Sequence, residues 1–188
     1  YKPWLREVYL LKAFTGRRNA ELFEMKWNMI NFENGKPVYI KSPNIKLNKQ
    51  QNNFNKNDLE YVYIPAGEEL KELLNTIGLQ NKKGSNEYLI APEIVNRTTI
   101  ENQASKSFTF FFKKLNKVET QRLRSLRKTY VTKEYVFVTS GISMQHNKHS
   151  TTYKHYVDRK EIAKEMVKKG FRIFNIEEEI DLSILEKK

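Results

Sequence analysis

The chain changes direction within one short stretch near its start, Thr15-Gly16-Arg17-Arg18-Asn19-Ala20-Glu21-Leu22. Before this stretch, residues 4–14 place apolar side chains at helical spacing, which predicts an amphipathic helix. Gly16 is the residue type that most often follows the end of a helix, and Asn19 is a residue type that can cap the next one. The stretch therefore predicts a glycine turn between two helices, with arginine at the start of the second.

The segment after the turn predicts a small antiparallel β element. The apolar face of the second helix is expected to consist of Leu22, Phe23 and Trp27. Asn34-Gly35 is a strong hairpin signal, and residues 36–40 and 61–64 have the composition of strands. Between them, residues 42–58 are rich in Asn, Lys and Gln, so we expect a long exposed hairpin tip or loop there.

The rest of the chain has helical patterns. Leucines after residue 67 mark a helix that ends near Gly78, and further helices are expected over 105–117, 125–138 and 161–169. The helix over 105–117 carries an apolar stripe that is typical of a core, made of Phe108, Phe111, Phe112 and Leu115. The sequence therefore predicts a mainly α fold with one small antiparallel sheet near its N-terminal part.

Composition restricts the classes of function. The 188 residues include 34 Lys plus Arg against 22 Asp plus Glu, which gives a formal net charge of +12. The apolar content of 39% suffices for a folded core. The absence of Cys excludes disulfides and thiol catalysis, and no apolar run has the length of a membrane span. We expect an intracellular protein that binds a polyanion, with nucleic acid favoured over an acidic membrane surface.

The arginines are few and clustered. Only nine of the 34 basic residues are Arg, and five of these nine lie in two short clusters, Arg17-Arg18 and Arg122-Leu123-Arg124-Ser125-Leu126-Arg127. Arginine grips phosphate with two parallel N–H donors, which lysine cannot do. The three histidines all lie between His146 and His155. A zinc site is disfavoured because neither Cys nor a carboxylate pair accompanies them, and we expect no metal and no cofactor.

Taken in order, three patches resemble the catalytic domain of tyrosine recombinases, the phage-integrase family. They are the stretch 15–22, the stretch 124–129 and the stretch 146–157, and they correspond to the family's T-G-x-R-x-x-E box, its H-x-L-R-H-T box and its G-H box with a following T-T and tyrosine. The resemblance covers nearly the whole chain. It implies the family's mainly α catalytic fold over residues 1–170 and a C-terminal tail helix over 171–188.

The resemblance also assigns roles to residues. It places Arg18 and Arg127 as the two catalytic arginines, with Glu21 orienting the first. Lys46 matches the hairpin lysine, although Lys49 is an alternative because the loop is longer than usual. The remaining matches are His146 for the histidine of the G-H box, where Gln145 replaces the glycine, and Tyr156 for the nucleophile, with Tyr153 as an alternative.

The sequence departs from the family at the H-x-L-R-H-T box. Arg124 stands where the family has its first histidine, and Lys128 stands where it has the second. Arg124 can donate to a phosphate oxygen, but it cannot accept a proton near neutral pH. Either the enzyme tolerates this replacement, or proton abstraction from Tyr156 falls to water or to a neighbouring group.

These residue types suit DNA cleavage without metal or ATP. A tyrosine hydroxyl can attack phosphorus and conserve the bond energy in a 3′-phosphotyrosyl link. Two arginines can neutralise charge on the non-bridging oxygens, and a hairpin lysine can protonate the leaving oxygen. The implied function is that of a site-specific recombinase, an integrase or transposase of a mobile element. The alternatives are a non-catalytic DNA-binding relative and a DNA-relaxing enzyme of the type IB topoisomerase kind.

The resemblance further implies partners. Double-stranded DNA is the expected substrate, and an accessory DNA-bending factor is a candidate partner. The tail carries Ile176, Ile180 and Ile184 on an otherwise acidic peptide. We expect it to be exchanged between protomers of a tetramer on synapsed DNA; the alternative is that it folds back on its own domain. We also expect an N-terminal DNA-binding region outside the given sequence, no membrane partner, and a bacterial cytoplasmic location at the nucleoid.

Overall fold

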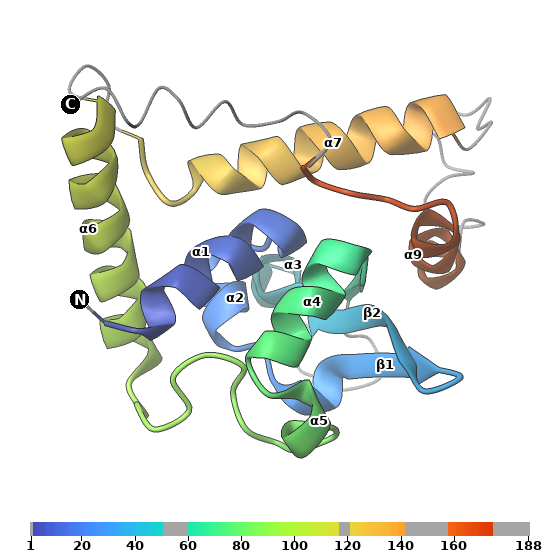
Figure 1. Ribbon diagram of the computed structural model, residues 1–188, viewed down its shortest axis with the longest axis horizontal. Coiled ribbons are helices and arrows are strands. Elements are labelled where there is room, and N and C mark those ends of the chain that lie inside the picture. Colours follow the sequence, from blue (N-terminus) through green and yellow to red (C-terminus); the bar gives the residue numbers. More distant parts are fainter. Residues whose placement is uncertain (1, 51–59, 117–120, 142–157, 175–188) are drawn as a thin grey trace.

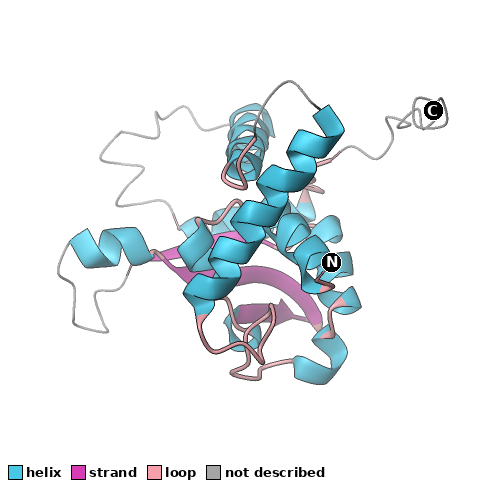
Figure 2. Ribbon diagram, turned by 90° about the vertical axis from the view of Figure 1, so that its left-hand side faces the viewer, coloured by secondary structure: helices cyan, strands magenta, loops and turns pink. Residues whose placement is uncertain are grey.

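The computed structural model describes residues 2–50, 60–116, 121–141 and 158–174. In this part of the chain helices predominate over a single small sheet (Figures 1 and 2). The helices are α1 (Trp4–Thr15), α2 (Asn19–Phe23), the 3-10 helix η1 (Trp27–Met29), α3 (Ile45–Gln50), α4 (Glu68–Thr76), α5 (Leu79–Lys82), α6 (Arg97–Asn116), α7 (Ser125–Gly141) and α9 (Arg159–Lys168). The strands are β1 (Ile30–Glu33), β2 (Lys36–Pro43) and β3 (Tyr61–Pro65). The expected mainly α fold with one antiparallel sheet is confirmed.

Helix α1 lies at the centre of the helical part and packs against α2, α4, α6 and α7. Its buried stripe contains Leu5, Val8 and Leu11, none of which exposes more than 3% of its surface. Full burial of one such side chain contributes about 1.5–3 kcal/mol. Figure 1 shows α7 running alongside α1, and this packing brings two distant parts of the sequence together at the turn after α1.

The sheet is antiparallel throughout, with the strand order β1-β2-β3. Asn34 and Gly35 both have positive φ, at 50° and 77°, as the turn of a tight two-residue hairpin requires. The hairpin expected at this dipeptide is therefore confirmed. Ile40 on β2 pairs with Ile64 on β3, both are buried, and α9 packs against these two strands.

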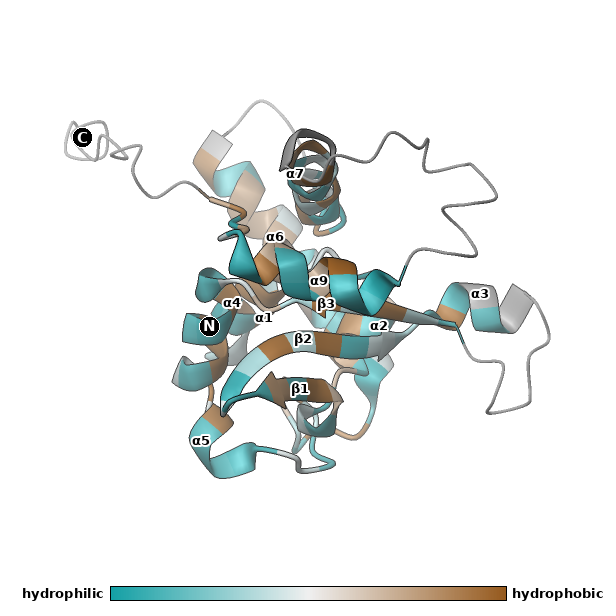
Figure 3. Cartoon of the chain, turned by 90° about the vertical axis from the view of Figure 1, so that its right-hand side faces the viewer, coloured by the Kyte–Doolittle hydropathy of each residue, from teal (hydrophilic) through white to brown (hydrophobic). Residues whose placement is uncertain are grey.

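The segment after β2 differs from the expected loop. Residues 42–58 were expected to be an exposed hairpin tip, but β2 continues to Pro43 and α3 occupies 45–50, while 51–59 lie outside the described residues. Asn44 and Asn48 tie this helix to the start of β3 through Glu60: the Asn44 N–H donates to the Glu60 carbonyl at 2.8 Å, and the Glu60 N–H donates to Asn48 Oδ1 at 2.8 Å. Figure 3 shows α3 projecting from the end of the sheet. Lys46 therefore lies on a helix rather than on a loop.

Two smaller expectations near the first turn were wrong. Arg18, not Asn19, occupies the N-cap position of α2, and Asn19 is the first helical residue. Trp27 lies beyond the end of α2, in η1, although it is buried at 1% exposure. The apolar face of α2 is thus shorter than expected.

Helix α6 is longer than expected, and its second half is exposed. The stripe on 105–117 was expected to be core, and Phe108 does pack against the core. Phe111 and Leu115, however, are 37% and 81% exposed. The main helical contacts of α6 are with α2 and α1, and the C-terminal end of the stripe is exposed rather than part of the core.

The core extends beyond residue 170. Phe171 and Ile173 are each 3% exposed. The buried carboxylate of Glu69 on α4 accepts hydrogen bonds from the backbone N–H groups of Ile173 at 2.7 Å and Phe174 at 2.8 Å. The first residues of the segment assigned to the tail are therefore fixed to α4, and the remainder, 175–188, lies outside the described residues. Among the helices described, none is both long enough and apolar enough to cross a membrane.

Candidate functional site

The turn between α1 and α2 is built around Gly16. Its φ of +57° is left-handed, and its N–H donates to the Lys12 carbonyl at 3.0 Å, closing the end of α1. A Cβ on this residue would lie 2.3 Å from Cδ1 of Tyr130 on α7. Only glycine fits here, because both the backbone conformation and the neighbouring ring exclude a side chain. The turn is consequently pressed against α7.

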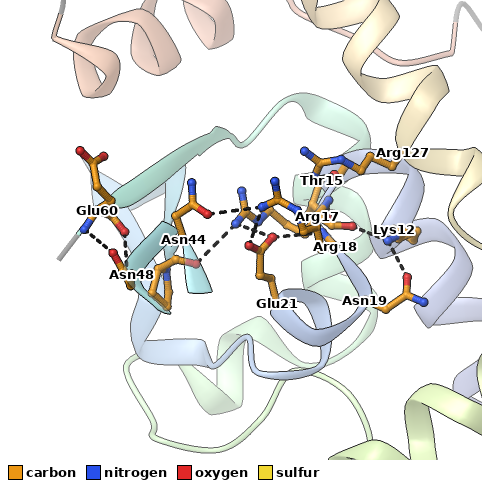
Figure 4. A network of polar contacts seen from close by, with 12 residues as sticks. Lys12, Thr15, Arg17, Arg18, Asn19, Glu21, Asn44, Asn48, Glu60 and Arg127 are labelled. Carbon is orange, nitrogen blue, oxygen red and sulfur yellow. Dashed lines mark hydrogen bonds and ion pairs between the residues drawn. The ribbon is translucent and has the colours of Figure 1, made fainter. Parts of the chain in front are cut away.

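Glu21 organises the two arginines of the turn. Its carboxylate is 1% exposed and pairs with Arg17 Nη2 at 2.7 Å and with Arg18 Nη1 at 2.9 Å. The same carboxylate accepts the Arg18 backbone N–H at 3.1 Å. Charge-assisted bonds of this kind are the strong ones. One buried acid therefore holds both side chains and the start of α2 (Figure 4).

The two arginines differ in exposure. The Arg17 side chain is 4% exposed, and its Nη2 also donates to the Pro43 carbonyl at the end of β2 at 3.4 Å. Burial lowers the pKa of Arg17 below its usual range. The Arg18 side chain is 39% exposed, and its Nη1 also donates to Asn44 Oδ1 at 3.3 Å. Arg17 is thus a structural link to the sheet, whereas Arg18 can reach a ligand.

Arg127 arrives at the same turn from α7. Its Nη1 donates to the carbonyl of Gly16, 111 residues earlier in the chain, at 2.6 Å. Burial lowers the pKa of Arg127, and the positive charge of Arg18 lowers it further. Two arginines therefore repel one another across the turn, which is the situation that a bound anion relieves.

A buried lysine completes the cluster. Lys12 is 1% exposed, and its Nζ donates to the Arg17 carbonyl and, at 2.7 Å, to Asn19 Oδ1. Burial first, and the charge of Arg127 second, lower its pKa to about 8. We refer to Lys12, Arg17, Arg18 and Arg127 as the cationic cluster.

Nearby carboxylates balance only part of the positive charge of the cationic cluster. Its direct ion pairs are with Glu21, while Glu101 and Glu134 act on Lys12 and Arg127 through longer-range attraction. Arg18 and the half-buried Arg127 retain exposed surface. Guanidinium groups held in this way are suited to the two non-bridging oxygens of a phosphate.

The other candidate residues stand apart from the cluster or outside the described residues. Lys46 is exposed on α3, two residues beyond Asn44, and no described contact joins it to the arginines. Arg124 is exposed just before α7, and its carbonyl accepts the Arg127 N–H at 3.1 Å; no contact with the cationic cluster is described for its side chain. His146, Tyr156 and the alternative nucleophile Tyr153 lie outside the described residues. The alternative lysine, Lys49, lies on α3, but its side chain is not described.

Arg97 shows why arginine alone does not mark a ligand site. Its guanidinium donates to four backbone carbonyls between 2.7 and 3.1 Å, those of Phe23, Ile90, Ala91 and Ile94. Those bonds tie the start of α6 to the loop before it and to the end of α2. The side chain is committed to the fold, in contrast to Arg18.

Sequence reasoning missed two members of the polar network. Lys12 was hidden because it falls in the apolar stripe of α1 next to Leu11, where a long cationic side chain is expected to reach solvent. Asn44 was assigned to a loop. A lysine inside an apolar helical stripe was the available signal for Lys12, and nothing in the sequence marked Asn44.

A metal-binding group of three or more His, Asp or Glu side chains is not found within the described ranges. The three histidines of the sequence lie outside those ranges. Comparisons of the chain with protein-family models, with curated proteins and with solved structures find no match.

Proposed function

We propose that the protein is a site-specific DNA recombinase that cuts and rejoins DNA through a 3′-phosphotyrosyl intermediate, with Tyr156 as the nucleophile. The observation that carries the proposal is the meeting of Arg18 and Arg127 at one turn, held by Glu21 and by the Gly16 carbonyl. The resemblance to tyrosine recombinases pairs these same two arginines. Their convergence across the sequence is what binding one phosphate from two sides requires.

In the proposed reaction the two arginines bind the non-bridging oxygens of the scissile phosphate. The Tyr156 hydroxyl attacks phosphorus and gives its proton to water or to a neighbouring group, the protein–DNA link forms, and the bond to the 5′ oxygen breaks. Lys46 supplies the proton to that oxygen. Attack by the freed 5′ hydroxyl on the phosphotyrosine then restores the DNA backbone and releases the tyrosine, so that no ATP is consumed.

Lys46 is retained as the proposed general acid, together with Lys49 as the alternative. Lys46 follows Asn44 by two residues, and Asn44 contacts Arg18. An exposed side chain on a short helix could reach a phosphate held by Arg18, since a lysine stem is long and flexible. General acid catalysis of this type typically contributes about 10²–10⁴ in rate.

DNA binding and strand cleavage are tested separately. For binding, the affinity for duplex DNA is measured over a series of salt concentrations. The logarithm of the binding constant falls with the logarithm of the salt concentration, with a slope of about −0.9 for each phosphate neutralised, so each contact removed makes the slope shallower by about that amount. Arg18→Ala and Arg127→Ala should each reduce the slope, while Arg172→Ala, which removes an exposed arginine with no described contact to Arg18 or Arg127, serves as the matched control. A salt-independent affinity in the wild type would rule out the proposed phosphate contacts.

For cleavage, the protein is incubated with nicked duplexes whose sequence is randomised around the nick, and covalent adducts are separated on denaturing gels. We expect an adduct with the wild type and with Arg172→Ala, and none with Arg18→Ala, Arg127→Ala or Tyr156→Phe. If Tyr156→Phe still forms the adduct and Tyr153→Phe does not, the nucleophile is Tyr153.

A non-catalytic DNA-binding protein is the second candidate, favoured by Arg124. This arginine stands where the family has a histidine, its side chain is exposed, and no described contact joins it to the cationic cluster. DNA binding that depends on Arg18 and Arg127, in the absence of any adduct over the whole randomised library, would favour this candidate over the recombinase.

We also propose that the protein assembles into a homo-oligomer on DNA through residues beyond Phe174. The supporting observation is the sequence of that segment, an acidic peptide with isoleucine at every fourth position from Ile176. Ile180→Asp should reduce the molar mass measured by light scattering in the presence of duplex DNA. An unchanged mass would refute assembly through this segment.

A further inference from the structure

Lys12 is a buried amine in a place where burial of a charge is unfavourable. It lies on the last turn of α1 with 1% of its surface exposed. Lysine is rarely buried to this extent unless it is paired. Its ordinary partner would be a carboxylate, but both hydrogen-bond acceptors of Nζ are neutral: the Arg17 carbonyl and Asn19 Oδ1.

These two acceptors flank Arg18 in the sequence. Lys12 therefore fixes the peptide before Arg18 and the side chain after it. Asn19 in turn donates through Nδ2 to Ser105 Oγ on α6 at 3.4 Å. Arg127 holds the Gly16 carbonyl from the side of α7. The backbone that carries Arg18 is thus clamped by one cation from α1 and one from α7 (Figure 4).

We propose that Lys12 is a positioning residue of the cationic cluster, which sets the direction of the Arg18 guanidinium and adds its own charge to the hold on a bound phosphate. The inference rests on the proposed function, because it assumes that Arg18 and Arg127 bind a phosphate. Lys12 itself does not touch the phosphate and acts through the turn.

The two parts of this role respond differently to pH. The charged groups that face Nζ are Arg127 on α7, Glu101 on α6, and Arg17 and Glu21 at the turn and on α2. With a pKa of about 8, Lys12 loses its proton just above neutral pH. A neutral amine keeps two N–H donors, enough for both described acceptors. Positioning therefore persists above pH 8, while the added charge is lost.

A bound dianion should reverse this loss by favouring the charged form of Lys12. Anion affinity is then expected to be highest below pH 8 and to fall as pH rises through that value. A lysine that served only to fill space in α1 would give no such step. The pH profile of anion binding therefore reports the charge that Lys12 adds, whereas its positioning role is read from the affinity that remains above the step, where the neutral amine still holds the turn.

Sulfate is the probe, since its charge is constant over the range in which Lys12 titrates. Calorimetric titrations of the full chain at low ionic strength should show affinity falling on the order of tenfold between pH 7 and pH 9.5. Lys12→Met retains the length of the side chain without its amine, and it should weaken binding at pH 7 and remove the step. Lys106→Met, which removes an exposed charge from α6, should leave the step in place.

Asn19→Asp is the second variant, and it tests the same inference without deleting the lysine. A carboxylate 2.7 Å from Nζ would pair with the ammonium form, so the midpoint of the step should move to higher pH. This variant keeps the inference testable if Lys12→Met does not fold.

The outcomes separate the inference from the function on which it rests. If the wild type binds sulfate and both Lys12→Met and Asn19→Asp keep its affinity and its midpoint, the role assigned to Lys12 is wrong while the phosphate site stands. If the wild type binds no sulfate at either pH, the phosphate site itself is wrong, and the inference is refuted with it.

Discussion

Replacing Glu21 by alanine should strongly destabilise the fold. Its carboxylate is 1% exposed and is the ion-pair partner of both Arg17 and Arg18. Removing it leaves the Arg17 guanidinium charged, with 4% of its side chain exposed. Breaking a buried pair in this way costs about 3–5 kcal/mol, mostly because the remaining charge has no compensation. We expect Glu21→Ala to lower the free energy of unfolding by that amount.

Urea unfolding, followed by the fluorescence of the buried Trp27, measures this loss. The matched control is Glu87→Ala, which removes a 54% exposed carboxylate paired with Lys82 and should change stability by less than about 1 kcal/mol. Adding Arg17→Met to Glu21→Ala should restore part of the loss, because it removes the uncompensated charge. A Glu21→Ala protein within about 1 kcal/mol of the wild type would refute the organising role of this carboxylate.

Three further predictions concern the turn at Gly16, the hydrogen bonds of Glu69 to residues 173 and 174, and the buried Lys12. Gly16→Ala should lower the free energy of unfolding, measured with urea, by more than Gly35→Ala does. Both glycines have positive φ, but only at Gly16 would the added Cβ lie 2.3 Å from an aromatic ring, that of Tyr130. Equal losses of stability in the two variants would contradict this close packing. Glu69→Ala should lower stability by about 2–3 kcal/mol and speed amide exchange in residues 171–174, since it leaves two backbone N–H groups unpaired, whereas the exposed Glu68→Ala should leave that exchange unchanged. The pKa of Lys12 is lowered from 10.5 to about 8 in the folded protein, so between these two pH values the unfolded state binds more protons and the free energy of unfolding should rise with pH. From pH 7 to pH 10 the wild type should gain about 2.5 kcal/mol of stability relative to Lys12→Met, measured by urea unfolding. A difference between the two proteins that does not change with pH would refute the lowered pKa.

Local patterns were sufficient to predict most elements of the fold. The apolar spacing in residues 4–14 predicted α1, and Asn34-Gly35 predicted the first hairpin. The leucines after residue 67 predicted α4. In each case a short-range signal agrees with the packing that follows, so that the sequence alone was enough.

Helix α3 could not be predicted in this way. Residues 45–50 are polar and have no apolar stripe, and what holds them is the pairing of Asn44 and Asn48 with Glu60. That contact depends on where β3 begins. The prediction that the end of α6 is buried was wrong for a related reason. The spacing of apolar residues predicts a stripe that includes Leu115, but burial of that stripe requires a neighbouring element.

The cationic cluster was predictable in part. The patterns around Arg18 and Arg127 marked both as functional, through the resemblance rather than through spacing. Lys12 was missed because a helical stripe shows which face is buried but not what charge the opposing helices present. The position of Lys12 in the apolar stripe indicates a buried side chain, but the neutral acceptors and the Arg127 charge that surround its amine come from the turn and from α7, which no local pattern in α1 reveals.

We propose that Arg18 and Arg127 present a DNA phosphate to Tyr156. The most direct measurement is mass spectrometry of peptides from the covalent adduct that the wild type forms on nicked duplex DNA. We expect a nucleotide attached through a 3′ phosphate to Tyr156, and no modified peptide from Arg18→Ala or Arg127→Ala protein. A nucleotide on any residue other than Tyr156 or its alternative Tyr153, or an adduct formed equally well by the two arginine variants, would contradict it.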